Sequence, residues 1–228
     1  MSEDLLRSAR VAPSILSADF ARLGEQIAAV MDAGARVIHV DVMDGHFVPP
    51  ITIGPLIVES IQEQVHDAGG WVDVHLMIER PEHQVANFAD AGADSITIHQ
   101  EATPHVHYAL EAVRDAGCKA GLALTPATPP EAAGDVLDAL DLLLCMTVDP
   151  GWGGQAYIPH STAKIARLRE LLPDTVALEV DGGIDVETAP GAAGAGANLF
   201  VAGSHVFGAP DPAQAYRELS AAADVENG

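Results

Sequence analysis

The chain has 228 residues, 48% of them hydrophobic, and its 33 acidic and 11 basic residues give a formal net charge of −22. This length supports one sizeable core, and no apolar run reaches the ~18 residues that a membrane span requires. The charge argues against a nucleic-acid partner, because no basic stripe is present to neutralise phosphates. Residues 1–4 lack the basic and then apolar layout of a signal peptide. We therefore expect a cytoplasmic protein with no membrane partner.

The acidic residues are spread along the chain, and Lys119 and Lys164 are its only lysines. A dispersed, lysine-poor acidic surface is typical of proteins from salt-rich cytoplasms, although ordinary acidic proteins share it. Cys118 and Cys145 lie far apart in the sequence, each beside a predicted strand. Without a secretory signal, we expect both to be free buried thiols.

Strand-like and helix-like patterns alternate eight times along the chain. The predicted strands are apolar runs that cover residues 11–16, 36–42, 71–77, 95–99, 119–124, 142–148, 176–180 and 197–202. The predicted helices carry apolar positions at helical spacing, and several of them end at a glycine. They cover residues 20–33, 54–65, 81–91, 104–116, 130–140, 159–172, 186–195 and 212–223.

Eight strand-then-helix units favour a (β/α)₈ TIM barrel over an open sheet. No linker composition divides the chain, so we predict a single domain over residues 1–228 with short disordered ends, about 1–8 and 224–228. Active sites of this fold form at the carboxyl ends of the strands. Candidate functional residues are therefore sought at those ends.

Polar side chains share one face at the end of the second predicted strand. Side chains alternate along a strand, so His39, Asp41 and Met43 point to one side and the aliphatic residues between them to the other. The third predicted strand ends in the same way with His75 and Met77. A His and an Asp at a strand end are explained equally well by a metal site and by a buried ion pair or a solvated strand end.

Metal-ligating side chains end three of the predicted strands, and they can converge on one divalent ion. These residues are His39, Asp41, His75 and Asp181. Imidazole combined with carboxylate suits Zn²⁺, Fe²⁺, Mn²⁺ or Co²⁺ better than Mg²⁺ or Ca²⁺. We therefore expect one divalent metal ion of that group per subunit.

Glycines cluster at three neighbouring strand ends, in residues 151–154, 182–183 and 203–204. Glycine lets backbone N–H groups approach an anion closely. The loops after the seventh and eighth strands are the usual phosphate site of this barrel. Turns alone explain each cluster, but the three together favour a phosphorylated small molecule as the ligand.

Several motifs carry a family resemblance. In order, they read APSILSADF (12–20), HVDVMDGHFVP (39–49), DVHLM (73–77), MTVDPGWGGQ (146–155), EVDGG (179–183) and GS (203–204). With these motifs the sequence resembles the ribulose-phosphate 3-epimerase family from residue 11 to about 212. Three loop positions depart from the family pattern, namely Pro50, Asp149 and Trp152. They put loop closure and substrate fit in question rather than the reaction.

The resemblance implies a TIM barrel of the ribulose-phosphate-binding type that interconverts D-ribulose 5-phosphate and D-xylulose 5-phosphate with one divalent metal ion. The matching metal ligands are His39, Asp41, His75 and Asp181. Asp41 and Asp181 also match the acid/base pair. Met43 and Met77 match methionines beside the reacting carbons. The matching substrate contacts are Ser14, His75, Gly151, Trp152, Gly153, Gly154, Asp181, Gly182, Gly183, Gly203 and Ser204.

Inversion at C3 of a 2-ketose phosphate removes a proton from one face and returns one to the other. Two carboxylates on opposite sides of the substrate achieve this without moving, provided that one starts ionised and the other protonated. Asp41 and Asp181 lie across the predicted barrel mouth. A divalent metal stabilises the resulting enediolate as a Lewis acid. Met43 and Met77 would form a wall that excludes water, although core packing also explains them.

Three other functions compete with this one. Epimerisation of a six-carbon ketose phosphate such as D-allulose 6-phosphate uses most of the same motifs. A sugar-phosphate lyase would need a cation near the leaving group, but neither lysine ends a strand. A non-catalytic phosphate-binding barrel would tolerate loss of one aspartate, yet both are present. His99 is a candidate for a residue that supports the site, and His46 could border the site. Apolar residues on the outer helices allow a homo-oligomer.

Overall fold

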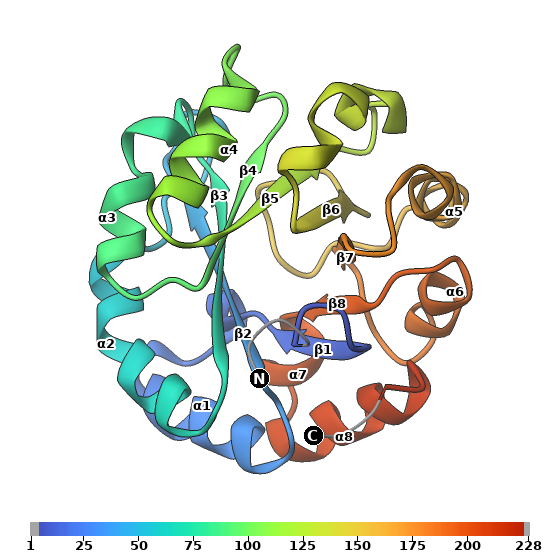
Figure 1. Cartoon of the computed structure of the whole chain (residues 1–228). Coiled ribbons are helices and arrows are strands. Elements are labelled where there is room, and N and C mark those ends of the chain that lie inside the picture. The colour runs from blue at the N-terminus through green and yellow to red at the C-terminus, as the bar shows by residue number, and fades with distance from the viewer. Residues whose placement is uncertain (1–4, 226–228) are drawn as a thin grey trace.

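A computed structural model describes residues 5–225 as a barrel of eight parallel strands with helices around it (Figure 1). The strands are hydrogen-bonded in the order β1-β8-β7-β6-β5-β4-β3-β2. A bridge between Ser14 and His39 joins the end of β1 to β2. The bounds of the strands are Arg10–Pro13 (β1), Val37–Met43 (β2), Trp71–Met77 (β3), Ser95–His99 (β4), Lys119–Leu124 (β5), Leu142–Met146 (β6), Ala177–Asp181 (β7) and Leu199–Ala202 (β8). The predicted TIM barrel is confirmed.

The α-helices that cover the barrel are Leu23–Asp32 (α1), Pro55–Asp67 (α2), Val85–Asp90 (α3), Val106–Asp115 (α4), Ser161–Leu171 (α5), Ala189–Gly194 (α6), Ser204–Phe207 (α7) and Pro212–Ala222 (α8). Within residues 5–225, four 3₁₀ helices accompany them, at Ile15–Ser17 (η1), Phe20–Arg22 (η2), Pro81–His83 (η3) and Pro130–Ala139 (η4). No helix among residues 5–225 is long and apolar enough to cross a membrane.

The predicted helices over 20–33 and 81–91 each begin as a 3₁₀ helix, η2 and η3, and three further differences follow. The first strand ends at Pro13, because the Ser14 side chain accepts a hydrogen bond from the Leu16 N–H and the chain turns into η1. The expected α-helix over 130–140 is a 3₁₀ helix, in a segment where Gly134 lowers α-helix propensity. The four residues of α7 were not predicted, since so short a helix has no periodic pattern.

Two described residues near the chain ends are buried. Leu6 is buried among Trp71 and Leu142 at the amino-terminal end of the barrel, and its carbonyl accepts a hydrogen bond of 2.6 Å from the Asn198 Nδ2. Val225 is buried in the main core. Residues 1–4 and 226–228 lie outside the described residues.

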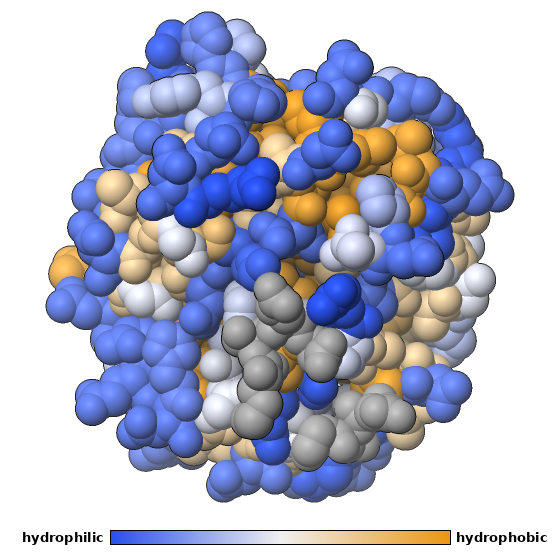
Figure 2. Space-filling model, viewed as in Figure 1, coloured by the Kyte–Doolittle hydropathy of each residue, from blue (hydrophilic) through white to orange (hydrophobic). Residues whose placement is uncertain are grey.

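Strand alternation divides the buried side chains into two sets. The aliphatic residues of β2, such as Val40, pack outward in the core between the strands and helices. The residues between them, His39 and Asp41, point into the barrel and are also buried. The barrel interior is apolar at its amino-terminal end, whereas toward its carboxyl end buried polar side chains lie beside buried methionines. Hydrophilic residues cover much of the barrel end seen in Figure 2, and an apolar area is visible in the upper part of the view.

Candidate active site

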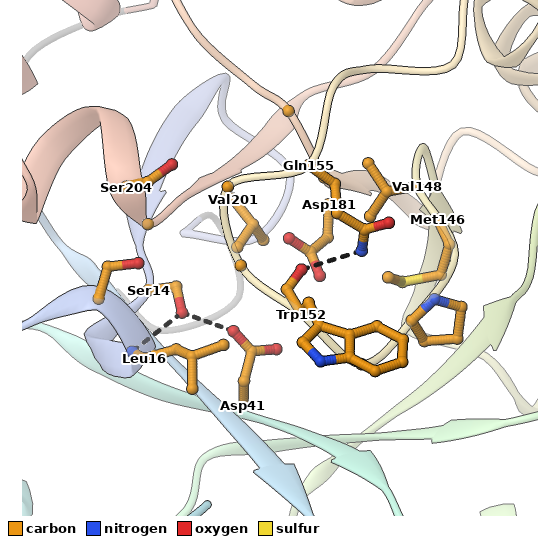
Figure 3. A pocket seen from close by; sticks show the side chains of 18 of the residues that line it. Ser14, Leu16, Asp41, Met146, Val148, Trp152, Gln155, Asp181, Val201 and Ser204 are labelled. Atoms are coloured by element: carbon orange, nitrogen blue, oxygen red, sulfur yellow. Dashed lines mark hydrogen bonds between the residues drawn. The ribbon is translucent and has the colours of Figure 1, made fainter. Parts of the chain in front are cut away.

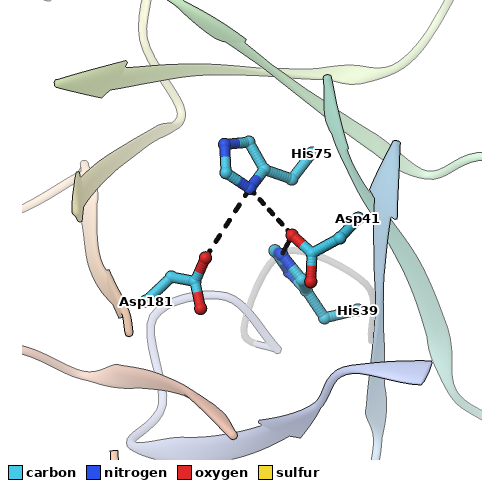
Figure 4. Close-up of side chains that lie close together, drawn as sticks. All are labelled: His39, Asp41, His75 and Asp181. Carbon is cyan, nitrogen blue, oxygen red and sulfur yellow. Dashed lines mark hydrogen bonds and ion pairs between the residues drawn. The ribbon is translucent and has the colours of Figure 1, made fainter. Parts of the chain in front are cut away.

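Two imidazoles and two carboxylates converge inside the carboxyl end of the barrel (Figure 4). The His39 Nε2 lies 3.3 Å from the Asp41 Oδ1. The His75 Nδ1 lies 3.0 Å from the same Asp41 oxygen and 3.8 Å from the Asp181 Oδ2. One ligand atom from each of the four residues lies within 4.8 Å of the others.

The register of the strands brings these side chains together. In the parallel pairing of β2 with β3, Asp41 lies directly opposite His75, and both side chains point inward. Asp181 is the last residue of β7, across the barrel, so its carboxylate approaches the other three from the opposite wall (Figure 4). The strict two-residue period of a strand therefore accounts for the convergence.

The separations within the cluster fit a small divalent ion. Bonds of 2.0–2.2 Å in tetrahedral geometry place ligand atoms about 3.4 Å apart, and the three distances above bracket that value. Two imidazole nitrogens with two carboxylate oxygens form the donor set that Zn²⁺ and its transition-metal neighbours accept. The cluster can therefore hold one divalent metal ion.

A chain of buried hydrogen bonds fixes the orientation of His39. Its Nδ1 lies 2.6 Å from the Asp73 Oδ2, and the Ser95 Oγ donates to the Asp73 Oδ1 at 2.5 Å. The Trp71 Nε1 donates in turn to the Ser95 Oγ at 2.8 Å. With its Nδ1 directed at the Asp73 carboxyl group, His39 presents Nε2 to Asp41.

Sequence reasoning missed the role of Asp73, although one signal was present. Asp73 precedes His75 by two residues, so the two share the inward face of β3.

Glu179 shares the inward face of β7 with Asp181 in the same way and lies 3.6 Å from the His39 Nδ1. Burial, followed by the charge of Asp73, raises the pKa of Glu179 well above its usual value. Burial and the neighbouring carboxylate therefore both favour the neutral form of Glu179.

The two aspartates of the cluster have pKa values that are shifted in opposite directions. Burial raises the pKa of Asp181 to about 7, and the charge of Asp41 adds to the shift. Burial also opposes the charge on Asp41, but His39 and His75 outweigh it and hold the pKa of Asp41 well below its usual value. Asp41 is therefore an ionised carboxylate, while Asp181 takes up a proton near neutral pH.

The two histidines are also shifted in opposite directions. Burial lowers the pKa of His75 to about 4, so its ring is neutral. For His39 burial acts in the same sense, but Asp41 and Asp73 outweigh it and raise the pKa well above the usual value. His39 would hold a metal ion only through an unprotonated Nε2, because only the unprotonated nitrogen is a ligand.

A cavity opens beside the cluster and contains almost all of the predicted substrate contacts (Figure 3). Those that line it are Ser14, Asp181, Gly151, Trp152, Gly153, Gly154, Gly182, Gly183, Gly203 and Ser204. The predicted contact His75 lies behind the lining and is fully buried. Lining residues that the sequence did not indicate are Leu16, Ser17, Met146, Val148, Pro150, Gln155, Ile184 and Val201.

Ser14 connects this cavity to the cluster. Its Oγ donates a hydrogen bond of 2.5 Å to the Asp41 Oδ2, the oxygen that does not face the histidines (Figure 3). Met43 and Met77 line the same cavity and pack together in a small buried apolar cluster. The thioethers therefore form a water-poor wall beside Asp41.

The glycine loops are shaped by close backbone contacts. Gly183 has φ +65°, and a Cβ atom there would lie 2.4 Å from the Tyr157 backbone nitrogen. The loop after β6 is held in turn by Gln155, whose Nε2 donates to the Asp149 and Trp152 carbonyls at 2.7 and 2.9 Å. Asp149 and Trp152, which depart from the family pattern, therefore lie in a loop that is held by these two hydrogen bonds to their own backbone carbonyls. Trp152 is 57% exposed at the mouth of the cavity.

Two carboxylates with opposite pKa shifts, a metal-capable cluster and three glycine loops meet at one mouth of this barrel, as in enzymes of the (β/α)₈-barrel class. The chain belongs to the ribulose-phosphate 3-epimerase family, whose model matches residues 10–207. The predicted family is confirmed.

Curated relatives agree with this assignment. The chain is 50% identical over 214 residues to the ribulose-phosphate 3-epimerase of Bacillus subtilis (strain 168), a match that covers 92% of this chain and 97% of the relative. It is 52% identical over 202 residues to the ribulose-phosphate 3-epimerase of Rhodobacter capsulatus, with 88% and 87% covered. The crystal structure of 3-hexulose-6-phosphate synthase from Salmonella typhimurium shares the fold alone, with a TM-score of 0.72, 17% identity and coverage of 94% and 98%.

Proposed function

We propose that this protein interconverts D-ribulose 5-phosphate and D-xylulose 5-phosphate, with Asp41 and Asp181 as the acid/base pair at C3. The observation that carries the proposal is the placement of these two carboxylates on β2 and β7, on opposite sides of one cavity (Figure 3). Family membership supports the reaction, because the curated relatives are named for it.

The opposite pKa shifts of the two aspartates assign their starting states. In one direction, the ionised Asp41 accepts the C3 proton, and the protonated Asp181 donates a proton to the opposite face of C3. In the other direction the two residues exchange roles. The hydrogen bond from Ser14 holds the Asp41 carboxylate in place as it takes up the proton. Met43 and Met77 keep water away from the enediolate between the two transfers.

A divalent ion held by His39, Asp41, His75 and Asp181 would act as a Lewis acid on the negative charge that develops at the substrate oxygens. The donor set supports Zn²⁺, Fe²⁺, Mn²⁺ or Co²⁺ as its identity.

The phosphate is proposed to lie at the opposite end of the cavity from the methionines. Gly182, Gly183, Gly203 and Ser204 line that end, at the loops after β7 and β8. Loops at these two strands are the usual phosphate site of the barrel. No lysine lines the cavity among the described residues: the Lys119 Nζ pairs with Asp141 at 3.0 Å. This arrangement argues against a sugar-phosphate lyase.

A comparison of substrates tests the proposal. Protein loaded separately with each of the four metal ions is incubated with D-ribulose 5-phosphate and with D-allulose 6-phosphate, and the products are separated chromatographically. We expect D-xylulose 5-phosphate to form much faster than any six-carbon epimer. Faster turnover of D-allulose 6-phosphate would transfer the assignment to a six-carbon epimerase. Failure of both substrates with every metal ion would favour the non-catalytic barrel.

We further propose that the chain acts as one domain in a cytoplasmic homo-oligomer. Ile51 and Leu56 follow β2 and are 80% and 79% exposed, which makes them candidates for a subunit contact. Sedimentation equilibrium distinguishes this state from a monomer, because a monomer has a mass of 23.7 kDa.

A further inference from the structure

His75 presents different nitrogens to two different neighbours. Its Nδ1 faces the metal-capable cluster, 3.0 Å from the Asp41 Oδ1. Its Nε2 faces away and lies 2.8 Å from the His99 Nε2. The His75 and His99 rings are both fully buried, with centroids 4.9 Å apart and an angle of 28° between their planes.

Two nitrogens 2.8 Å apart share a single hydrogen, so one ring donates and the other accepts. The His75 Nδ1 binds a metal only when it is unprotonated, which requires the hydrogen of the neutral ring to sit on Nε2. The His99 Nε2 must then be the acceptor. A neutral His99 ring with an unprotonated Nε2 carries its own hydrogen on Nδ1.

Glu101 supplies the acceptor for that hydrogen. Its Oε2 lies 3.2 Å from the His99 Nδ1. Its other oxygen, Oε1, accepts from the Thr125 N–H at 3.0 Å, from the Thr125 hydroxyl at 2.9 Å and from the Thr128 hydroxyl. Although burial opposes its charge, hydrogen bonds from His99, Thr128 and Thr125 lower the pKa of Glu101 to about 2. The carboxylate is therefore ionised and fixed in direction.

We propose that Glu101 is a positioning residue that acts through His99 to hold His75 with its hydrogen on Nε2, so that Nδ1 is available to the divalent ion. The chain of contacts is directional at each step, from the Glu101 carboxylate to His99 and from His99 to His75. His39, in contrast, presents Nε2 to the cluster, because Asp73 accepts the hydrogen on its Nδ1. The two histidines thus face the cluster with opposite ring nitrogens and would hold a metal ion through them, each orientation being selected by a separate carboxylate.

Substitution Glu101→Gln reverses the direction of this chain. The Thr125 N–H is an obligatory donor, so the amide oxygen of Gln takes the position of Oε1 and the NH₂ group takes that of Oε2. A donor then faces the His99 Nδ1, and the ring favours its hydrogen on Nε2. That hydrogen points at the His75 Nε2 and favours a hydrogen on the His75 Nδ1, the metal-binding nitrogen.

Metal affinity tests the proposal directly, by competition of Zn²⁺ and Co²⁺ with a chromogenic chelator. We expect Glu101→Gln to weaken binding by about 10–100-fold. Glu101→Ala removes the acceptor without adding a donor, so we expect a smaller loss. Glu79→Gln, the same change at an exposed position after β3, serves as the control and should bind as wild type does. Equal affinity of Glu101→Gln and wild type, or equal losses in Glu101→Gln and Glu101→Ala, would overturn the proposal.

A second measurement reports which ring nitrogens of His75 and His99 carry a hydrogen. A role of Glu101 in stability alone would not determine these positions. In zinc-loaded wild type, ¹⁵N NMR of the histidine side chains should show His99 with hydrogen on Nδ1 only and His75 with hydrogen on Nε2. A His99 ring with hydrogen on Nε2 would overturn the proposal even if Glu101→Gln failed to fold. The inference rests on the metal site of the proposed function, but neither measurement uses a sugar phosphate. A protein that passes both tests and does not epimerise ribulose 5-phosphate would overturn the proposed function alone.

Discussion

Substitution Gly183→Ala tests whether the loop after β7 needs a close backbone approach. Gly183 has φ +65°, a conformation that costs a residue with a Cβ roughly 1–2 kcal/mol. The added Cβ would lie 2.4 Å from the Tyr157 nitrogen and 2.9 Å from the Gln155 carbonyl oxygen. These are backbone atoms, so no side chain can rotate away.

The contact must open by about 1 Å to reach an ordinary separation of ~3.5 Å, and overpacking of this kind costs roughly 1–3 kcal/mol. The sum, about 2–5 kcal/mol, lowers Tm by roughly 4–20 °C for a chain of this size. A displacement of about 1 Å beside the proposed phosphate site also lowers kcat/KM by about 100-fold.

The matched control is Gly191→Ala. Gly191 lies in α6, and no atom lies within 4 Å of the position that an added Cβ would take, so alanine there should raise stability by about 0.5–1 kcal/mol. Thermal unfolding and initial rates with D-ribulose 5-phosphate are measured for both variants. If Gly183→Ala matched Gly191→Ala in Tm and in kcat/KM, the close approach would have no role in stability or in the site.

Three further predictions concern the buried network, the thiols and the surface. Asp73→Asn replaces a group that accepts from both His39 and Ser95 with an amide, so metal affinity should fall about 10–100-fold in a chelator competition, and an unchanged affinity would refute the role of Asp73. Burial raises the pKa of both Cys118 and Cys145 to about 11, so a thiol reagent at pH 8 should modify neither in the folded protein and both after denaturation. At 1 M salt the screening length falls to ~3 Å, so repulsion among the charges that sum to −22 should weaken. The Tm should therefore rise between 0.1 and 2 M KCl. A lower Tm in 2 M KCl would argue against adaptation to salt.

The inward face of β2 could be predicted from the sequence because a strand has a strict two-residue period. That period alone places His39, Asp41 and Met43 on one side. Convergence with His75 and Asp181 follows from the fold, since parallel strands of a barrel present their carboxyl ends at one mouth. The fold and the four residues of the cluster could therefore be predicted from the sequence.

The hydrogen bonds that support the cluster could not be predicted in this way. Asp73 reaches His39 because β2 and β3 pair in a register that places the two residues opposite each other. The two-residue spacing from His75 places Asp73 on the inward face of β3, but it does not identify the residue of β2 that lies opposite, which depends on the strand register. Glu101 is fixed by the loop after β5, through Thr125, which is distant in sequence. His99 could be proposed as a supporting residue, but its partner Glu101 could not.

The central claim is proton transfer at C3 by two aspartates, and solvent exchange tests it most directly. Metal-loaded wild type, Asp181→Asn and the exposed control Asp174→Asn are each incubated with D-ribulose 5-phosphate in D₂O and followed by proton NMR. We predict xylulose 5-phosphate with deuterium at C3 from wild type and control, and a rate of inversion at least about 100-fold lower for Asp181→Asn. Inversion by Asp181→Asn at the wild-type rate, or product from wild type that keeps its C3 proton, would contradict the two-aspartate mechanism.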